Sequence, residues 1–481
     1  FRSRVILSRL DRLDESSRNM LKVASVIGRT FQQWLLHSIY PYETAVQELE
    51  AHLLDLCDKD LLDRSEIMYL FRHVMTREVA YESLLYADRR AFHQKIGDSI
   101  VAQQGAHLKE YLEALAEHYT LAENWPQALQ YQLQAGRRAQ AVYANEDAIH
   151  RFQQALQIAD RLPDSEAMTI EIHEALGDTC QLIGQYDQAL DSYATARELL
   201  HAGPASPKAR RHHADLCRKT GRVYEYQGEY ERALEWVNRG LDMAGGDAHL
   251  ETAQLTLGGA AVFQREGKWQ AAIEWADRSR EIAEQLSSTE AQRVAAHAYY
   301  LLGNGYRRLG ESERAGRYYR RSLETYQALE DRPGMARAYN NLATFYRYQD
   351  DWAQAADYYQ QALQALERIG DLYGQAVVAN NLAEVLLNRG QLAQAEAQYR
   401  RSLEIAQELG ISGLVALLHN NLGHTALRGE QWERALPALQ TSQDMFAQLG
   451  AEEFLPELYR HLAEVHLGLS DLDQAASWAQ A

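Results

Sequence analysis

The 481-residue chain is poor in cysteine and proline, with 3 Cys and 8 Pro, and holds 29 Gly. The three cysteines lie far apart and form no Cys-x-x-Cys pair, which argues against a disulfide framework or a zinc site and fits a reducing cytoplasm. So little proline and glycine excludes collagen-like and linker sequences. No apolar run reaches the roughly eighteen residues that a membrane-spanning helix needs. We therefore expect a cytoplasmic protein.

The short motifs of common enzymes are also missing. The sequence contains no G-x-x-x-x-G-K-[ST] phosphate-binding loop, no H-E-x-x-H and no G-x-S-x-G, and its only Gly-Lys pair is followed directly by Trp269. Nor is there a Cys/His cluster suited to a metal ion. We therefore predict that this chain by itself is not an enzyme and has no catalytic residue, no metal site and no cofactor of its own.

Basic residues are outnumbered, with 49 Lys and Arg against 67 Asp and Glu and a net charge of −18. This balance disfavours extensive contact with nucleic acid, because phosphate binding needs clustered cations. With 46% hydrophobic residues, the chain has a globular composition. It starts without Met and without a signal peptide, so we expect it to begin inside a larger protein.

What the chain does have is an internal period. The segments YNNLATFY, ANNLAEVL and HNNLGHTA place a small residue at Ala343, Ala383 and Gly423, two steps of 40, and the same step reaches Gly303 and Ala463. Less regular members are Ala260, Gly221 and Gly177. A second small position recurs twelve residues later, followed after four more by a larger residue at Tyr193, Val237, Tyr319, Tyr359, Tyr399 and Leu439.

Small residues at two fixed positions let paired antiparallel helices pack closely, and one pair cannot bury its apolar face alone. These residues resemble the tetratricopeptide repeat in a 40-residue variety, over about residues 110–481. The predicted fold is mainly α: a small winged-helix domain at 1–100, linking helices and a first irregular repeat at 101–160, and an α-solenoid superhelix of about eight repeats at 161–481, with the regular period starting from residue 303. Two overlapping matches leave the helix boundaries between 126 and 160 open.

The first hundred residues have no such echo, and their charge is nearly balanced. We expect a helix ending at Gly28, a short helix over Phe31–Ile39, an amphipathic helix over residues 43–58, and two strands around a polar turn at Asp63–Glu66. This order is typical of a winged helix. The helix at 43–58 has five carboxylates and no Lys or Arg, so DNA binding through it is disfavoured.

The segment FRHVMTREVAYESLL, with SRLD and LKVASVIGRTF before it, resembles the winged-helix part of STAND-class signalling ATPases, including maltose-regulon-activator-like and cyclase-linked bacterial members. The resemblance implies a P-loop ATPase upstream, with ATP or ADP bound only together with that missing domain, and a repeat array acting as sensor. It also assigns His73 a contact with the β-phosphate of ADP. Alternatively, His73 simply caps the helix that begins at Val74.

Three consecutive repeats carry a pair of asparagines on the expected concave face. In peptide-binding tetratricopeptide proteins the Asn before the Leu bonds the peptide backbone, which corresponds here to Asn341, Asn381 and Asn421. An amide both donates and accepts, so such a ladder suits an extended peptide; alternatively, the amides bond neighbouring repeats or water. The candidate groove comprises Asn340, Asn341, Asn380, Asn381, Asn420, Asn421, Arg337, Thr344, Arg347, Glu384, His424 and Arg428.

The leading hypothesis is the sensor region of a STAND ATPase. Its repeats would bind a protein, peptide or small effector, its winged helix would relay the signal to the ATPase, and activation would involve oligomerisation. The second hypothesis is a free-standing tetratricopeptide adaptor or peptide receptor without an ATPase. The third is a regulator that binds DNA directly. We expect no nucleic-acid and no membrane partner.

Overall fold

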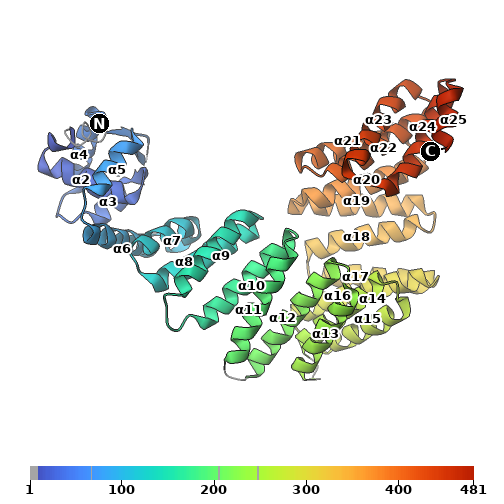
Figure 1. Cartoon of the computed structure of the whole chain (residues 1–481), viewed down its shortest axis with the longest axis horizontal. Helices are drawn as coiled ribbons and strands as arrows, with labels where there is room; N and C mark the ends of the chain where they lie inside the picture. The colour runs from blue at the N-terminus through green and yellow to red at the C-terminus, as the bar shows by residue number, and fades with distance from the viewer. Residues whose placement is uncertain (1–8, 67, 204–205, 246–248, 481) are drawn as a thin grey trace. The chain divides into compact units, whose positions relative to one another are not determined.

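The computed structural model describes residues 9–66, 68–203, 206–245 and 249–480. The chain divides into two compact units, Phe1–Val223 and Tyr224–Ala481, and this division falls inside the predicted repeat array. Both units are built mainly from paired helices, as the period predicts (Figure 1). In the part of the chain that the structure describes, no helix is long and apolar enough to cross a membrane.

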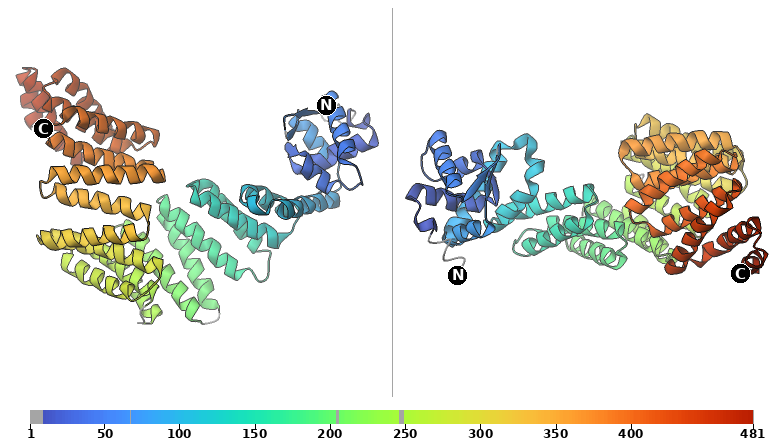
Figure 2. Two further views of the ribbon diagram at one scale, coloured as in Figure 1. Left: turned by 180° about the vertical axis from the view of Figure 1, so that it is seen from behind. Right: turned by 90° about the horizontal axis from the view of Figure 1, so that it is seen from above.

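The first unit opens with helices around a small sheet, whose strands are visible in the right-hand view of Figure 2. The antiparallel strand order is β1-β3-β2. Asp14 caps the first helix by accepting from the Ser17 N–H at 2.9 Å, and the helix ends before Gly28 as predicted. The elements are α2 (Glu15–Ile27), β1 (Thr30–Gln32), α3 (Gln33–Ile39), α4 (Val46–Asp58), β2 (Leu62–Arg64), β3 (Met68–Phe71), α5 (Val74–Glu82) and α6 (Tyr86–Gln103).

Three local predictions need correction. Phe31 lies in β1 and not in a helix, because its buried ring stacks on Tyr69 of β3 at 5.7 Å and the strand pairs there. The amphipathic helix begins at Val46, three residues later than predicted. Strand β2 continues through Arg64, so Asp63 belongs to a strand of the hairpin and not to the turn.

Repeat-like pairs follow within the same unit. The two overlapping sequence matches are both real, because α8 packs against α7 on one side and α9 on the other. The elements are the 3-10 helix η1 (Gly105–Tyr111), α7 (Leu112–Leu121), α8 (Trp125–Ala141), α9 (Asn145–Ala159), α10 (Glu166–Leu182), α11 (Tyr186–Ala202) and α12 (Pro207–Tyr226).

The second unit continues the helical pairs, stacked side by side in Figures 1 and 2. Its elements are α13 (Tyr230–Ala244), α14 (Leu250–Arg265), α15 (Trp269–Glu284), α16 (Thr289–Arg308), α17 (Ser312–Ala328), α18 (Arg332–Arg347), α19 (Trp352–Ile369), α20 (Leu372–Asn388), α21 (Leu392–Glu408), α22 (Ser412–Arg428), α23 (Trp432–Leu449), the 3-10 helix η2 (Glu452–Phe454), α24 (Leu455–Gly468) and α25 (Leu472–Gln480).

The small positions work as the spacing predicts. A Cβ added to Gly303 would lie 2.7 Å from the Tyr319 ring, and one added to Gly177 would lie 2.5 Å from Tyr193. In both of these pairs the large residue of the second helix packs onto a glycine of the first. In α14 the same kind of close approach is at Gly259, where an added Cβ would lie 2.4 Å from Trp275, and the predicted small residue Ala260 lies next to it and is fully buried.

The first helix of each pair lies on the inner side of the stack in the second unit. Helix α14 contacts α16, α16 contacts α18, and α22 contacts α24, whereas second helices of neighbouring pairs make fewer contacts with one another. In these three cases neighbouring first helices contact each other directly, and the first helices line the concave side of such a stack. All twelve predicted groove residues belong to three of these first helices, α18, α20 and α22.

Candidate ligand-binding groove

Two neighbouring positions in each first helix control how one repeat bonds the next. The first slot lies three residues before the small residue and the second slot two residues before it. The Asn421 amide donates to Asn380 Oδ1 at 2.9 Å, and His461 Nδ1 lies 3.0 Å from Asn420 Oδ1. In both cases the first slot of one repeat bonds the second slot of the next. We call this line of contacts the inter-repeat seam.

The first unit has the same contact in ionic form. Glu174 of α10 holds the first slot and Lys219 of α12 the second, and their charged atoms are 2.6 Å apart. Lys219 also bonds Asp178 at 2.7 Å, and His212 bonds Glu174 at 2.7 Å. Burial would raise the pKa of Glu174, but hydrogen bonds from His212 and Lys219 outweigh it and hold that pKa at about 2. The seam is closed here.

The seam is open at α18. Tyr300 holds the first slot of α16, and no hydrogen bond joins it to Asn341 in the described structure. Asn340 Oδ1 is buried and has no hydrogen-bond partner among the described residues, although Asn381 occupies the second slot of the next repeat. The Asn381 oxygen instead lies 3.4 Å from the amide nitrogen of its neighbour Asn380. Two asparagines of one helix thus retain hydrogen-bonding capacity.

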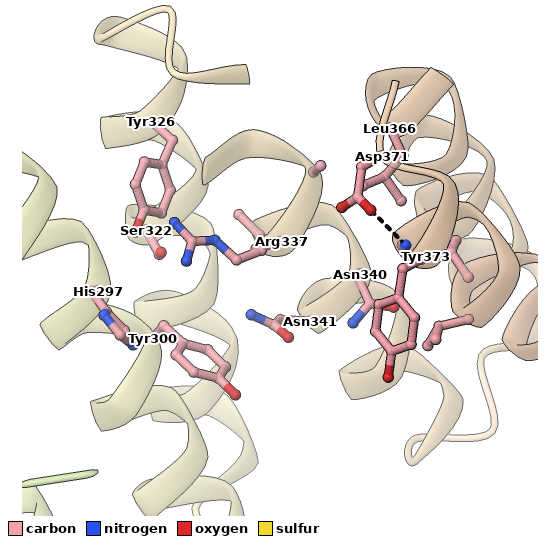
Figure 3. Close-up of a pocket in the computed structure, with 15 residues that line it drawn as sticks. His297, Tyr300, Ser322, Tyr326, Arg337, Asn340, Asn341, Leu366, Asp371 and Tyr373 are labelled. Atoms are coloured by element: carbon pink, nitrogen blue, oxygen red, sulfur yellow. Dashed lines mark hydrogen bonds between the residues drawn. The ribbon is translucent and has the colours of Figure 1, made fainter. Parts of the chain in front are cut away.

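A cavity of about 360 Å³ lies at this opening (Figure 3). Arg337, Asn340 and Asn341 come from α18 in the middle, between α16 and α20. Helix α18 also contributes Ala336 and Ala338. The remaining lining is largely aromatic and apolar and comes from α16, α17, the end of α19 and the start of α20 with its cap residue: His297, Tyr300, Ser322, Tyr326, Leu366, Asp371, Tyr373, Gly374, Val377 and Val378. A concave, mainly apolar space with a few convergent polar groups is typical of a ligand site.

The other predicted groove residues are mostly engaged by the protein itself. Thr344 bonds the Tyr359 hydroxyl at 3.0 Å, and Arg347 pairs with Glu384 at 2.5 Å. The His424 ring stacks on His461 with centroids 4.3 Å apart, and Arg428 is exposed at the end of α22. Of the twelve residues, the cavity brings together only Arg337, Asn340 and Asn341.

Sequence reasoning missed the aromatic walls. The asparagine pattern does not indicate Tyr300, because Tyr300 and Leu301 stand where the later repeats carry the Asn pair. Aligning the repeats at 40 residues puts Tyr300 in the same slot as Asn340, so the break in the ladder was visible in the sequence. Tyr326 and Tyr373 lie near helix ends, outside the repeated positions, and no spacing signal indicates them.

His73 occupies the N-cap position of α5 and is exposed. Its backbone carbonyl accepts from the Thr76 N–H at 2.9 Å, but its ring forms no capping hydrogen bond. The imidazole is therefore accessible for another contact.

A chain of hydrogen bonds that the sequence did not indicate starts from the same helix. The Tyr81 hydroxyl of α5 lies 3.0 Å from His93 Nε2 of α6, and His93 Nδ1 lies 2.9 Å from His118 Nδ1 of α7. Burial lowers the pKa of His93 to about 3 and that of His118 to about 4, so both rings are neutral near pH 7.

A family model described as tetratricopeptide repeat matches residues 144–201, 251–328, 293–368, 334–408 and 374–448, together more than half of the chain. The chain belongs to the tetratricopeptide repeat family. The predicted helical solenoid is confirmed. A search of curated proteins found no match.

Several solved structures are similar to this tetratricopeptide protein. A signal transduction ATPase with numerous domains (STAND) carrying a tetratricopeptide repeat sensor, from Pyrococcus horikoshii, matches with a TM-score of 0.51 and 14% identity over 92% of this chain and 65% of that one. BtubC from P. vanneervenii matches at 0.39 and 19% over 51% and 93%. A Rap protein complexed with competence and sporulation factor matches at 0.46 and 13% over 73% and 95%. At 14% identity, the match to the STAND protein shows a similar fold and nothing more.

Proposed function

We propose that the chain is the sensor region of a STAND-type signalling ATPase, and that the cavity at α16, α18 and α20 binds an extended peptide or protein segment. The observation that carries the proposal is the open seam. The next seam, between α20 and α22, is bonded through Asn421 and Asn380, whereas Asn340 Oδ1 is buried with no hydrogen-bond partner among the described residues. A buried polar atom left unbonded costs about 1–3 kcal/mol. A ligand that donates to it recovers that free energy.

An extended peptide suits this opening because its backbone alternates donors and acceptors. Asn340 can accept from a peptide N–H, and Asn341 can both accept and donate. The aromatic rings of Tyr300 and Tyr373 lie on either side of α18 and offer apolar contact to side chains (Figure 3). A volume of about 360 Å³ accommodates a short stretch of a longer segment.

The relay to an upstream ATPase is the second part of the proposal. The order helix, strand, two helices and hairpin supports a winged helix over the first hundred residues. The accessible His73 ring supports a contact with ADP bound to the ATPase domain. The Tyr81–His93–His118 chain would couple α5, which begins next to His73, to α7 at the start of the repeats. Oligomerisation on activation belongs to the same proposal.

Affinity selection tests the peptide site. The chain is immobilised, a random pool of N-acetylated hexapeptides is passed over it, and bound peptides are sequenced by mass spectrometry. We expect enrichment that is lost in Asn341→Ala. The matched control is Asn421→Ala, which removes an amide from a closed seam outside the cavity and should select the same peptides. Equal selection by wild type and Asn341→Ala would contradict the site.

Nucleotide exchange tests the relay. In the parent protein, His73→Ala should speed ADP dissociation, measured with a fluorescent ADP analogue, whereas Arg72→Ala at the neighbouring exposed position should not. A parent protein without a phosphate-binding loop would overturn the relay and favour the free-standing peptide receptor. A direct role in DNA binding predicts a gel shift at low salt. The acidic α4 argues against one, because Asp55 and Glu50 pair with Lys59 and Arg64, which lie outside that helix.

A further inference from the structure

We propose that the α18 cavity selects a peptide segment with an acidic side chain at Arg337 and a basic side chain at Asp371, so that the segment binds in one direction. This inference rests on the proposed peptide site and adds its charge pattern. It comes from two ionic groups of the cavity that their own repeats leave unpaired, one at each side of the Asn340–Asn341 pair.

Arg337 is the unpaired cation. It is exposed, lines the cavity, and forms no ion pair or hydrogen bond with any residue that the structure describes. The corresponding positions of the next two repeats hold Val377 and Leu417, so the cation is particular to this helix. Several arginines of α16 to α18 instead form an ion pair or lie over a ring: Arg293 pairs with Asp331, Arg307 lies over Tyr348, Arg308 over Trp269, and Arg347 pairs with Glu384.

Asp371 is the unpaired anion, and comparison with the previous repeat explains why. Asp331 caps α18 through the Gly334 N–H at 2.9 Å, and its other oxygen accepts from Arg293 at 2.8 Å. Asp371 caps α20 in the same way, through the Gly374 N–H at 2.8 Å. The residue 38 positions before it, where Arg293 would correspond, is Pro333. Asp371 therefore keeps its capping bond but has no cation among the described residues.

The two charges lie on opposite sides of the cavity. In Figure 3 Arg337 extends toward Ser322 and Tyr326 on the α17 side, with Asn341 toward Tyr300. Asp371 and Asn340 lie on the other side, next to Tyr373 at the start of α20. A segment crossing from α16 to α20 would thus meet a cation, two amides and then an anion. Reversing the segment would bring like charges together, which disfavours the reversed binding mode.

The charge pattern also indicates what the site rejects. A strongly basic segment gains at Asp371 but meets Arg337, and a strongly acidic one gains at Arg337 but meets Asp371. The site is therefore not a general receptor for cations or anions. A guanidinium favours a carboxylate because two parallel N–H donors match its two oxygens. We accordingly expect Asp or Glu at one end of the bound segment and Lys or Arg at the other.

Charge reversal tests the inference with the same hexapeptide pool. Wild type should enrich peptides with one acidic and one basic residue at a fixed spacing. Arg337→Glu should enrich Lys or Arg where wild type takes Asp or Glu, and should weaken the best wild-type peptide at least about tenfold by fluorescence polarisation. Asp371→Asn keeps the capping oxygen and should lose only the preference for the basic residue.

The matched control is Arg278→Glu, which makes the same charge change at an exposed position of α15 outside the cavity and should keep the wild-type preference. Enriched peptides that Arg337→Glu selects unchanged, yet that Asn341→Ala loses, would overturn the charge pattern and leave the peptide site intact. The absence of any enriched peptide would overturn the peptide site itself. Arg337→Gln, which removes the charge without reversing it, guards against misfolding and should show an intermediate affinity.

Discussion

The seam between α10 and α12 and the seam around α18 use the same two helix positions. The first is joined by an ion pair, whereas no hydrogen bond crosses the second among the described residues. In the first unit, Lys219 bonds Glu174 and Asp178 and little of its side chain reaches solvent. In the second unit, Asn340 and Asn341 hold the corresponding place and line a cavity, and Asn340 Oδ1 is buried without a hydrogen-bond partner among the described residues. A solenoid needs each repeat to contact its neighbour. The comparison indicates that apolar packing holds the repeats together at α18, which leaves polar groups there for a ligand.

The aromatic packing around α18 supports this division of roles. Tyr346 stacks on Tyr358 with centroids 5.5 Å apart, and Phe345 meets Tyr319 of the previous pair at the same distance. Gly334 lets the start of α18 approach Tyr326, since an added Cβ would lie 2.1 Å from that ring. These apolar contacts stabilise the helix independently of the seam. Mutating one seam at a time therefore tests whether the two seams contribute differently to stability.

The largest effect is expected at the ionic seam. Lys219→Met removes the cation and leaves Glu174 and Asp178 without their main partner, so the free energy of unfolding should fall by about 3 kcal/mol. Urea unfolding followed by circular dichroism measures the change. Arg337→Met, which removes an unpaired exposed cation, is the control and should change stability by less than about 0.5 kcal/mol. Equal losses in the two variants would show that the seams do not differ.

Acid should weaken the seam between α22 and α24, where His461 bonds Asn420. His461 is neutral, with Nδ1 donating to Asn420 Oδ1 and Nε2 accepting from Arg460. Burial, with His424 and Arg460 nearby, lowers the pKa of His461 to about 3. Its contribution is therefore complete above the unfolded pKa of about 6.5 and is lost as pH falls toward 3, at up to roughly 1.4 kcal/mol per pH unit. Urea unfolding between pH 7 and 4.5 measures it, and His461→Asn should flatten the dependence.

The ionic seam should respond with the opposite sign. A hydrogen bond to Glu174 raises the pKa of His212 despite burial. A raised folded pKa gives stability that is complete below about 6.5 and is lost as pH rises through the folded value. The difference in unfolding free energy between wild type and His212→Gln should therefore grow as pH falls from 8 to 6. A difference that shrinks over this range would contradict the assigned partner.

The period made the repeat architecture predictable, because helix pairing depends on small residues at fixed spacing. Gly177 and Gly303 each pack against the ring that the spacing predicts. What could not be predicted was which amides bond each other. Asn340 and Asn380 are both followed by Asn-Leu-Ala, yet of the two only Asn380 is bonded across to the next repeat among the described residues. That difference depends on side-chain rotamers and on the aromatic rings beside α18, which no spacing encodes. The helix predicted to begin at Phe31 was wrong for a related reason, because Phe31 lies in a strand that forms by pairing with Tyr69, far away in the sequence.

A smaller effect distinguishes two asparagines in the same slot. Asn421→Ala removes the donor to Asn380 Oδ1 and should lower the free energy of unfolding by about 1 kcal/mol. Asn341→Ala removes an amide without a partner among the described residues and should change stability little. Urea unfolding of both variants, compared with wild type, gives the difference. Equal stability of the two variants would indicate that the Asn421–Asn380 bond contributes nothing.

The smallest expected change in the free energy of unfolding is that of Asn340→Ala, and its sign distinguishes a binding role from a packing role. Asn340→Ala deletes the buried oxygen that has no partner, and alanine is the better helix former, so the free energy of unfolding should stay constant or rise by up to about 1 kcal/mol. Peptide binding should weaken in the same variant, because the acceptor is gone. Urea unfolding and fluorescence polarisation on one preparation measure both. A protein that becomes more stable as it loses its ligand shows that the unbonded amide serves binding; a loss of stability would instead assign Asn340 to the packing of α18.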